Sequence, residues 1–540
     1  MGLPEVYHRV FLAFMRYAAP AMAGVILLRC ALPLLTFRRQ MPIWGYLEDH
    51  AGRQLPITHW ENVIGRSRGC DVRLEFPTVS RNHAVLTRYD DGSWSVVNAN
   101  SKSGITVNGQ MGEIFVLSDG DTLELGGVEL QFHTGQPESK VQGRGAGRSA
   151  GNLFLLTVLQ FCSCMAFLLG SSAAGQAVML GFGALAVTQW LLFAGYLAAG
   201  RASFEVETVA FFLCTMGMAV IATVTPRETG KQMVAVLLGV VTFLLVLWSV
   251  GALERAKRFR YLAAVAGMGL LVVTLLFGQV IYGAKNWLVI GGVSLQPSEL
   301  AKVCYVYVGA STMDRLVKKR NLILLIAYTV ALCGLLALMN DFGTALVFFA
   351  AFLLIAYLRS GSVGTVALAC TALLFAGVIG LQMAPHALRR FLSWRHIWED
   401  PWGAGFQQTQ ALMCIASGGL FGLGIGRGKM KRLFAADSDM VFATVAEEWG
   451  LVMALLPVIV IMVLAGFAFR CAKDSRSSFY TIAACTAGGI LLVQTILNVL
   501  GTVDGLPLTG VTFPMLSNGG SSMLSVWGLL ALIKAADPRQ

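Results

Sequence analysis

Charged residues are scarce in this sequence. Asp, Glu, Lys and Arg make up 13% of the 540 residues, while hydrophobic residues make up 56%. Soluble proteins carry about 25% charged residues, so a wholly soluble chain is excluded. The composition predicts an all-α polytopic membrane protein with a soluble part attached to it.

The 11 cysteines form neither a disulfide framework nor a metal-binding cluster. Most of them, such as Cys214, Cys304 and Cys485, lie within apolar segments, where cysteine acts as a small hydrophobic residue. Cys162 and Cys164 are separated by a single residue, which does not match the C-x₂₋₄-C spacing of zinc sites. We predict no metal ligands and no cofactor, and the sequence does not decide whether a divalent metal takes part.

A nucleotide-binding loop is also lacking. The glycine-rich run 419–428 invites comparison with GxxxxGK[ST], but Leu423 occupies a required glycine position and Met430 follows Lys429. The net charge of +11 suggests nucleic acid at first sight. Most basic residues, however, lie in short loops between apolar segments, where they face anionic lipid. We therefore expect no nucleic-acid partner.

Apolar segments of helix length fill most of the chain after Asn152, and a membrane span needs about 20 such residues. An earlier apolar stretch, 11–35, contains Arg16, Pro20 and Arg29, so it is either a span or an interfacial anchor. No signal-peptidase-like site follows it, so we do not expect it to be cleaved. Twelve later segments are predicted, near 153–170, 176–199, 203–224, 232–252, 260–281, 298–313, 322–339, 343–358, 363–382, 441–468, 479–501 and 515–535.

Lys and Arg gather in alternate loops, such as 255–260, 315–320 and 470–476. The positive-inside rule places these loops and the C-terminus in the cytoplasm of a cell-membrane protein, and the loop 383–440 outside. This loop breaks the rule, because it carries more cations than acids. Either an anionic ligand such as a pyrophosphate accounts for them, or a loop near 60 residues escapes the rule.

Residues 42–134 have a different composition. Short alternating runs such as 83–89 and 121–127 are separated by Asp-Gly and Asn-Gly turn signals. This spacing predicts an all-β sandwich. A glycine-rich basic linker, 135–151, follows.

Within this sandwich, Gly65-Arg66, Ser80-x-x-His83 and Asn108-Gly109 resemble the signatures of the forkhead-associated (FHA) domain. The resemblance implies a cytoplasmic reader of a phosphothreonine protein made by a Ser/Thr kinase, with His83 structural. Ser103 stands where the family often has Asn, which puts affinity or specificity in doubt. The residues expected to bind the phosphopeptide are Arg66, Ser80, Arg81, Lys102 and Ser103.

Four blocks in the second half of the chain occur in order, within 283–302, 340–346, 390–450 and 506–522. Together they resemble the SEDS family (RodA/FtsW/SpoVE) of peptidoglycan glycosyltransferases. The resemblance implies a SEDS-type ten-helix core at 203–540. About three extra spans precede it, in a membrane segment at 1–41 and two helices at 152–202. SNGG at 517–520 replaces the commoner SYGG.

The resemblance makes Asp439, in Ser438-Asp439-Met440, the expected catalytic residue. Glycan polymerisation needs a base for the attacking hydroxyl and cations for the departing pyrophosphate. A helix N-cap is the alternative for Asp439, and Asp341 is either a cap or a catalyst. The residues expected to bind substrate are Arg390, Glu299, Lys302, Lys429, Lys431, Arg432, Ser517, Gly519 and Gly520.

The resulting hypothesis is polymerisation of lipid II on the outer face of the membrane, with undecaprenyl pyrophosphate leaving. The resemblance implies a class B penicillin-binding protein as transpeptidase partner. A flippase for lipid-linked precursors and a non-enzymatic division scaffold remain alternatives, and only the enzyme needs Asp439 as a base. The sequence does not distinguish roles in division, elongation or sporulation.

Overall fold

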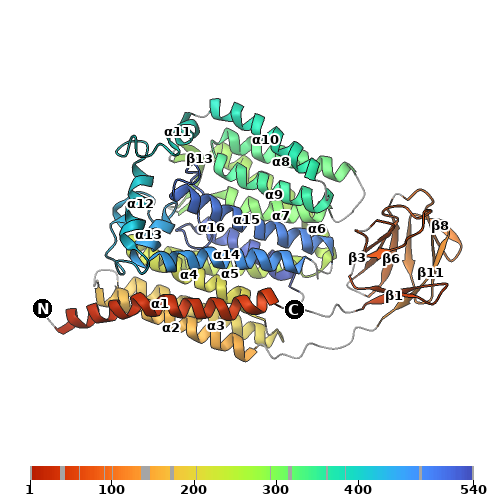
Figure 1. Cartoon of the computed structure of the whole chain (residues 1–540), viewed down its shortest axis with the longest axis horizontal. Helices are drawn as coiled ribbons and strands as arrows, with labels where there is room; N and C mark the ends of the chain where they lie inside the picture. The colour runs from red at the N-terminus through yellow and green to blue at the C-terminus, as the bar shows by residue number, and fades with distance from the viewer. Residues whose placement is uncertain are drawn as a thin grey trace.

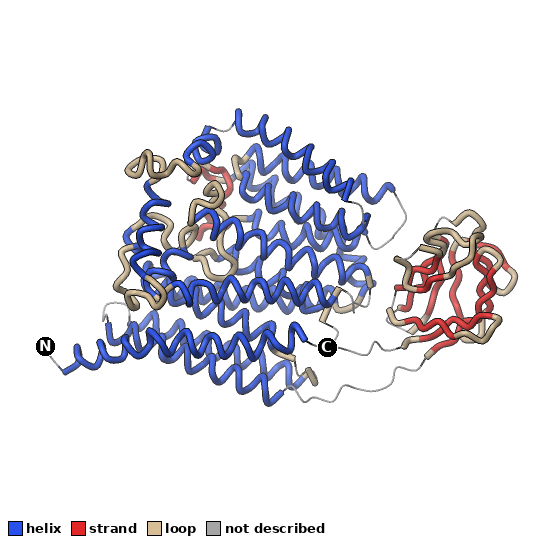
Figure 2. Tube along the Cα trace, viewed as in Figure 1, coloured by secondary structure: helices blue, strands red, loops and turns tan. Residues whose placement is uncertain are grey.

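The computed structural model describes all residues except 1–2, 37–42, 60, 68, 90–91, 100, 136–145, 171–174, 202, 282, 292, 314–318, 361–362, 384, 473–476 and 538–540. The described residues form a helical bundle and a β-sandwich (Figure 1). Outside the sandwich, the strands drawn in Figure 2 form one small sheet at an end of the bundle. The predicted fold class is therefore confirmed.

The β-sandwich consists of two sheets, with strand orders β2-β1-β11-β10-β7-β8 and β4-β3-β5-β6-β9. Its strands are β1 Gly45–Asp49, β2 Gln54–Ile57, β3 Glu61–Gly65, β4 Val72–Arg73, β5 Ala84–Arg88, β6 Trp94–Asn98, β7 Ile105–Val107, β8 Gln110–Gly112, β9 Ile114–Leu117, β10 Thr122–Leu125 and β11 Val128–Thr134. Because side chains alternate across a strand, one face of each sheet turns inward. Leu47, Leu86 and Phe132 are fully buried there.

The Asn-Gly signal produces the expected hairpin between β7 and β8. Asn108 and Gly109 both have positive φ, 50° and 80°, and Val107 pairs with Gln110. A two-residue type I′ turn needs positive φ at both positions, and Asn-Gly tolerates this best.

The bundle contains most of the remaining described residues. Its helices are α1 Leu3–Thr36, α2 Ala146–Gly170, α3 Gly175–Ala198, α4 Glu205–Val224, η1 Pro226–Glu228, α5 Thr229–Val250, α6 Leu253–Phe277, α7 Pro297–Met313, α8 Lys319–Leu338, α9 Phe342–Ser360, α10 Val363–Met383, α11 Pro385–Ser393, α12 Phe406–Gly418, η2 Met430–Arg432, α13 Val441–Glu448, α14 Leu451–Cys471, α15 Ser478–Thr502 and α16 Gly520–Ala535. The small sheet, β12-β13-β14, comprises Gln279–Ile281, Ala284–Ile290 and Val293–Leu295.

Ten helices in the described part of the chain are long and apolar enough to cross a membrane, namely α1–α6, α8, α9, α14 and α15. Helices α7, α10 and α16 lie among them in Figure 1 and occupy three more of the predicted segments. The protein is thus a multi-pass membrane protein.

Helix α1 is one long helix through Pro20 and Pro33. Its Ala19, Ala23 and Cys30 belong to the buried core of the bundle, which favours a span over an interfacial anchor. Helix α2 begins at Ala146, inside the predicted linker.

The early start of α2 has a tertiary cause. Arg148 donates a hydrogen bond to the carbonyl of Arg29 in α1, and Ser149 is buried. Contact with α1 therefore stabilises helical structure in residues that were predicted to be part of the linker from their glycine content. Residues 136–145 of that linker lie outside the described residues.

The predicted segment 441–468 is wrong as a single helix. It divides at Trp449-Gly450 into α13 and α14. Gly450 has φ 91°, and a Cβ there would lie 2.3 Å from the carbonyl oxygen of Leu420. The chain turns sharply at this glycine because the glycine-rich run packs directly against it.

Two ends of the bundle differ in character (Figure 1). One end carries the small sheet, α11, α12 and α13. The helix ends that lead to and from the sandwich, at Thr36 of α1 and Ala146 of α2, lie at the opposite end. The sequence reasoning did not predict the small sheet.

Candidate active site

A cavity of about 850 Å³ lies among η1, α5, the small sheet, α11 and the loops before α13 and α16. Part of its lining is apolar, including Val234, Leu238 and Phe391. Such a lining suits a ligand with both a polar and a hydrocarbon part. Among the described residues, its charged lining members are Glu228, Lys231, Asp341, Arg390, Asp437 and Asp439.

The backbone of the loop Asp437–Asp439 is held by residues from α15 and from the loop before α16. Asn518 N donates to the Asp437 carbonyl at 2.7 Å, and Ser517 Oγ donates to the Ser438 carbonyl at 2.7 Å. Asn498 Nδ2 donates to the Asp439 carbonyl at 3.0 Å. Three successive carbonyls are therefore satisfied, which fixes the course of the loop.

The two aspartates of this loop differ in their side-chain partners. Asp437 Oδ2 accepts hydrogen bonds from Thr225 Oγ1 at 3.1 Å and from Asn518 Nδ2 at 2.9 Å. In the described part of the chain, no residue donates a hydrogen bond to the Asp439 carboxylate. Asp439 is therefore the aspartate whose carboxylate stays free for a ligand.

Burial raises the pKa of Asp439 from 3.8 to about 6. The guanidinium of Arg390 opposes this change and the carboxylate of Asp437 reinforces it. Gly510, with φ 71°, lies beside both members of the pair: a Cβ there would be 3.5 Å from Asp439 Oδ2 and 3.6 Å from Arg390 Nη1. Arg390 Nη1 also donates to the Leu508 carbonyl at 3.3 Å.

Of the residues expected to bind substrate, Arg390, Gly519 and Gly520 line the cavity. Ser517 does not line it. Its hydroxyl accepts a hydrogen bond from Phe513 N at 2.9 Å and donates to the Ser438 carbonyl. Ser517 therefore braces the loop, and a substrate cannot reach its hydroxyl without breaking these bonds.

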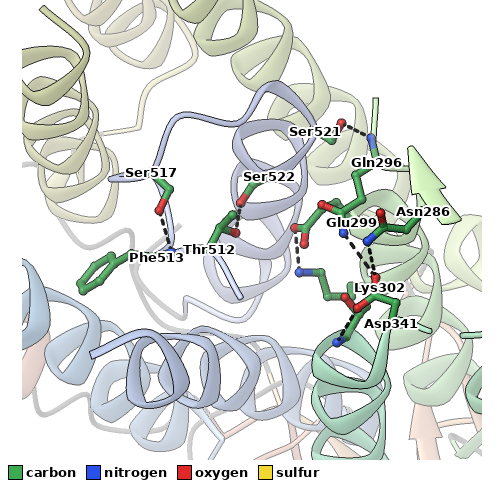
Figure 3. Close-up of polar contacts among 11 residues, drawn as sticks. Asn286, Gln296, Glu299, Lys302, Asp341, Thr512, Phe513, Ser517, Ser521 and Ser522 are labelled. Atoms are coloured by element: carbon green, nitrogen blue, oxygen red, sulfur yellow. Dashed lines mark hydrogen bonds and ion pairs between the residues drawn. The ribbon is translucent and has the colours of Figure 1, made fainter. Parts of the chain in front are cut away.

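Glu299 and Lys302 do not line the cavity either. Figure 3 shows their side chains turned toward one another in the first turns of α7, with Lys302 Nζ 2.7 Å from Glu299 Oε2. Both side chains are buried, and the pair follows the i,i+3 spacing. Their geometry is that of an internal ion pair, and neither side chain is placed to bind a substrate in the cavity.

Lys429, Lys431 and Arg432 lie outside the cavity lining. The backbone amides of Lys429 and Met430 donate to the carboxylate of Glu447 at 2.9 and 2.8 Å. Lys431 Nζ donates to the carbonyl of Gly426. The structure thus does not place these three cations in the cavity with Asp439.

The sequence reasoning missed several polar residues of the cavity. Asn286 Nδ2 donates to Asp341 Oδ2 at 2.9 Å, and Gln296 Nε2 approaches the same oxygen at 3.4 Å (Figure 3). Asp341 Oδ1 accepts from Thr344 N at 3.1 Å, which makes Asp341 the cap of α9. The backbone amide of Gln296 in turn donates a hydrogen bond to Ser521 Oγ at 2.8 Å.

Glu228 and Lys231 were also missed. They lie on η1 and the first turn of α5, with Lys231 Nζ 3.4 Å from Glu228 Oε1. The available signal was a charged pair at the start of a helix, in a loop predicted to lie on the same side as 383–440. The pair is separated from Asp439 by roughly 200 residues of sequence. Only the packing of α5 beside α16 reveals their proximity to the loop.

In the β-sandwich, the predicted phosphopeptide residues gather around Ser80. Ser80 Oγ accepts a hydrogen bond from Lys102 N at 3.1 Å, and the Ser80 carbonyl accepts from Arg66 N at 3.0 Å. Arg66, Arg81 and Ser103 are exposed. The hydroxyl proton of Ser80 is thus free to donate within a cationic surface.

His83 lies beneath this surface and is fully buried. Its Nδ1 accepts a hydrogen bond from Ser80 N at 3.1 Å, and its Nε2 is 2.9 Å from the Gly104 carbonyl. The ring thereby joins two of the loops that carry the phosphopeptide residues. His83 is therefore structural, as expected.

A multi-helix membrane fold with a cavity that is partly polar and partly apolar, lined by Asp439 and Arg390, defines the class of this domain. A family model for FtsW, RodA and SpoVE, described as "Cell cycle protein", matches residues 203–540. A model of the FHA domain matches residues 62–126. The chain therefore belongs to the FtsW/RodA/SpoVE family and carries an N-terminal FHA domain.

Individual relatives agree with this assignment. "Peptidoglycan glycosyltransferase RodA" of Mycobacterium tuberculosis is 30% identical over 327 residues, which cover 57% of this chain and 69% of the relative. "Probable peptidoglycan glycosyltransferase FtsW" of Tolumonas auensis is 30% identical over 350 residues, or 61% and 90% of the two chains.

One solved structure also matches, a chain described under "Structural coordination of polymerization and crosslinking by a peptidoglycan synthase complex". It is 26% identical, with a TM-score of 0.51, and the match covers 61% of this chain and 96% of that chain.

Proposed function

We propose that this protein is a peptidoglycan glycosyltransferase that polymerises lipid II on the outer face of the cytoplasmic membrane. Relatives that carry this activity in their names support the reaction class. The observation that carries the proposal is the cavity in which the unpaired carboxylate of Asp439 lies beside Arg390.

The proposed reaction has one bond-forming and one bond-breaking event. A sugar hydroxyl of one glycan attacks the anomeric carbon of the other, and Asp439 takes the hydroxyl proton. The bond from that carbon to the pyrophosphate oxygen breaks, and undecaprenyl pyrophosphate leaves with the electron pair. A carboxyl pKa raised to about 6 makes Asp439 a stronger base than an exposed aspartate while keeping it mostly ionised at pH 7.

Arg390 supplies the positive charge for the leaving group. Its guanidinium forms a planar fork that matches phosphate oxygens. The apolar side of the cavity, with Val234 and Leu238 on α5, suits the first isoprene units of the lipid. The Asn286–Gln296–Asp341 cluster offers donors and acceptors for sugar hydroxyls.

The test is polymerisation of lipid II by the purified full chain together with a class B penicillin-binding protein. We expect glycan strands from the wild type and a loss of at least about a hundredfold in Asp439→Asn, which keeps the size of the side chain and removes the base. Normal polymerisation by Asp439→Asn, or no polymer from the wild type, would refute the proposal.

A lipid-linked precursor flippase is the second candidate, because it too needs a cavity with charged residues and an apolar side. One experiment distinguishes transport from polymerisation. Asp439→Asn should leave transfer of a fluorescent lipid across proteoliposomes unchanged if the protein only transports. A scaffold without enzymatic activity predicts that Asp439→Asn is silent in cells.

The FHA domain is proposed to bind a phosphothreonine protein made by a Ser/Thr kinase. Kinases act in the cytoplasm, so this function requires the sandwich on that side and the cavity on the other. The arrangement of the helix ends, with the sandwich connections remote from α11–α13, supports such a topology (Figure 1). The class B partner is supported by the matched chain, which comes from a complex of polymerization and crosslinking.

A further inference from the structure

Asn518, on the wall of the cavity, contacts two carboxylates at once. Its Nδ2 donates to Asp437 Oδ2 at 2.9 Å and to Glu228 Oε2 at 2.9 Å. Its backbone amide donates to the Asp437 carbonyl at 2.7 Å. The residue thus joins the start of α5 to the loop that carries Asp439, although the three segments lie far apart in the sequence.

We propose that Asn518 is a positioning residue, which occupies the Asp437 carboxylate and so leaves Asp439 as the base. The assignment rests on the proposed function. Without Asn518, Asp437 would keep only the hydrogen bond from Thr225 to its side chain among the described residues. Its carboxylate would then be free to turn toward Arg390 and compete with Asp439 for that cation.

The chemistry of the amide explains why asparagine suits this position. An amide NH₂ has two protons and no charge, so it bridges two carboxylates without adding a cation to the cavity. A lysine or arginine would also bridge them, but its positive charge would lower the pKa of Asp439 and weaken the base. A carboxylate would repel both partners, and alanine would leave them facing each other unbridged.

Several charged groups set the electrostatics of Asp439. Arg390 approaches it from α11, and Asp437 lies on the same loop. Glu228 and Lys231 on η1 and α5, and Asp341 before α9, line the same cavity. A new carboxylate at position 518 would lie next to Asp437 and Glu228 and would add to the negative potential at Asp439.

The experiment measures the rate of lipid II polymerisation against pH for the full chain with its transpeptidase partner. Asn518→Asp has nearly the same shape and replaces the donor by a carboxylate. We expect the acidic limb of its profile to move to higher pH by about one unit, which lowers the rate at pH 6 about fivefold. Adding Glu228→Gln, which supplies a donor to the introduced carboxylate, should reverse part of this displacement.

Gln410→Glu is the matched control. It makes the same amide-to-acid change on α12, in a half-buried residue that does not line the cavity. We expect it to leave the acidic limb in place. Unfolding temperatures in detergent check that each variant is folded.

The assignment is overturned if the acidic limb of Asn518→Asp lies at the same pH as in the wild type. This holds even if the rate falls uniformly, because a purely structural role would lower the rate equally at every pH. An equal displacement in Gln410→Glu also overturns it. If the wild type forms no polymer, the proposed function fails and the assignment fails with it. If the wild type is active and the acidic limb of Asn518→Asp does not move, the assignment of Asn518 is refuted and the proposed function stands.

Discussion

At the scale of single residues, hydrogen bonding separates two aspartates that the sequence presents as near neighbours. Asp437 is bound by Thr225 and Asn518, whereas the structure gives Asp439 a neighbouring cation, Arg390, and partial burial. Burial without a hydrogen bond disfavours the charged form of a carboxyl group. The proposed base is therefore a group whose ionised form destabilises the folded protein.

Because burying the ionised Asp439 carboxylate is unfavourable, the folded protein should become more stable when this carboxylate is removed. The pKa of Asp439 in the folded protein, about 6, lies above the value of 3.8 for an unperturbed carboxyl group. The protonated group therefore stabilises the folded protein below pH 4, and this contribution is lost as the pH rises through 6. At pH 8, Asp439→Asn should be more stable than the wild type by on the order of 1 kcal/mol, after allowing for partial exposure.

The measurement is the unfolding temperature in detergent at pH 8 and pH 5. The advantage of Asp439→Asn should shrink at pH 5, where the wild-type carboxyl group is largely protonated. An equal advantage at both pH values would mean that the substitution acts through packing. No advantage at pH 8 would mean that the carboxylate is better solvated or paired than its burial indicates.

The same group predicts the pH dependence of the reaction. A general base works only when deprotonated. The polymerisation rate of the wild type should therefore fall about tenfold for each unit of pH below the Asp439 pKa of about 6. A rate that stays constant from pH 7 to pH 5 would exclude Asp439 as the base.

At the scale of elements, the glycine-rich run 419–428 packs against α13 and is held there by backbone hydrogen bonds. Leu423 N and Gly424 N donate to the carbonyls of Glu447 and Glu448 at 2.9 and 3.0 Å. The Glu448 side chain accepts from Gly428 N and Thr223 Oγ1, and burial raises its pKa to about 7. The glycines allow the two backbones to approach closely.

Gly422→Ala tests this packing. Gly422 has φ 79°, and a Cβ there would lie 2.2 Å from the Glu448 carbonyl oxygen. Backbone strain and the clash together should destabilise the protein by about 3 kcal/mol. The unfolding temperature should fall clearly further than in Gly426→Ala.

Gly426 is the matched control because its φ is 75° but nothing lies within 4 Å of a Cβ there. Its substitution carries the backbone strain alone, about 1 kcal/mol. Equal losses in the two variants would show that the close approach of the run to α13 is not important for stability.

At the scale of the whole molecule, the two proposed binding sites lie in separate domains. The cavity lies at the end of the bundle with α11–α13, and the helix ends at Thr36 and Ala146 that connect the sandwich lie at the other end (Figure 1). A phosphopeptide and a lipid-linked sugar would therefore bind without contact between them. Recruitment and catalysis should be separable by mutation.

Arg66→Ala tests this separation. Removing the guanidinium from the cationic surface around Ser80 should weaken binding of phosphothreonine peptides at least about tenfold. Polymerisation by the purified chain should stay unchanged. Arg73→Ala is the control, because Arg73 is an exposed cation of the same sandwich that pairs with Glu75 at 3.1 Å.

Peptide binding is measured by fluorescence anisotropy with phosphorylated and unphosphorylated peptides. Loss of polymerisation in Arg66→Ala would contradict the independence of the two sites. Equal effects of Arg66→Ala and Arg73→Ala on binding would contradict the predicted phosphopeptide surface.

The sequence alone predicted the architecture and singled out the acid that we propose as the base. Hydropathy located the helices, because a membrane span must satisfy its own backbone within one continuous apolar segment. Turn signals such as Asn108-Gly109 located the sandwich, because the required φ values are local. Motif order pointed to Asp439 and Arg390, which line one cavity.

Only the tertiary structure decided which polar residues meet. Thr225 and Asp437 share a hydrogen bond although 212 positions separate them, and Glu228 and Asn518, 290 positions apart, share another at the cavity wall. Charge and polarity in a sequence tell that a residue needs a partner, since burial without one is costly. Which partner it finds depends on the packing of helices distant in the chain, and local sequence patterns carry no record of that packing.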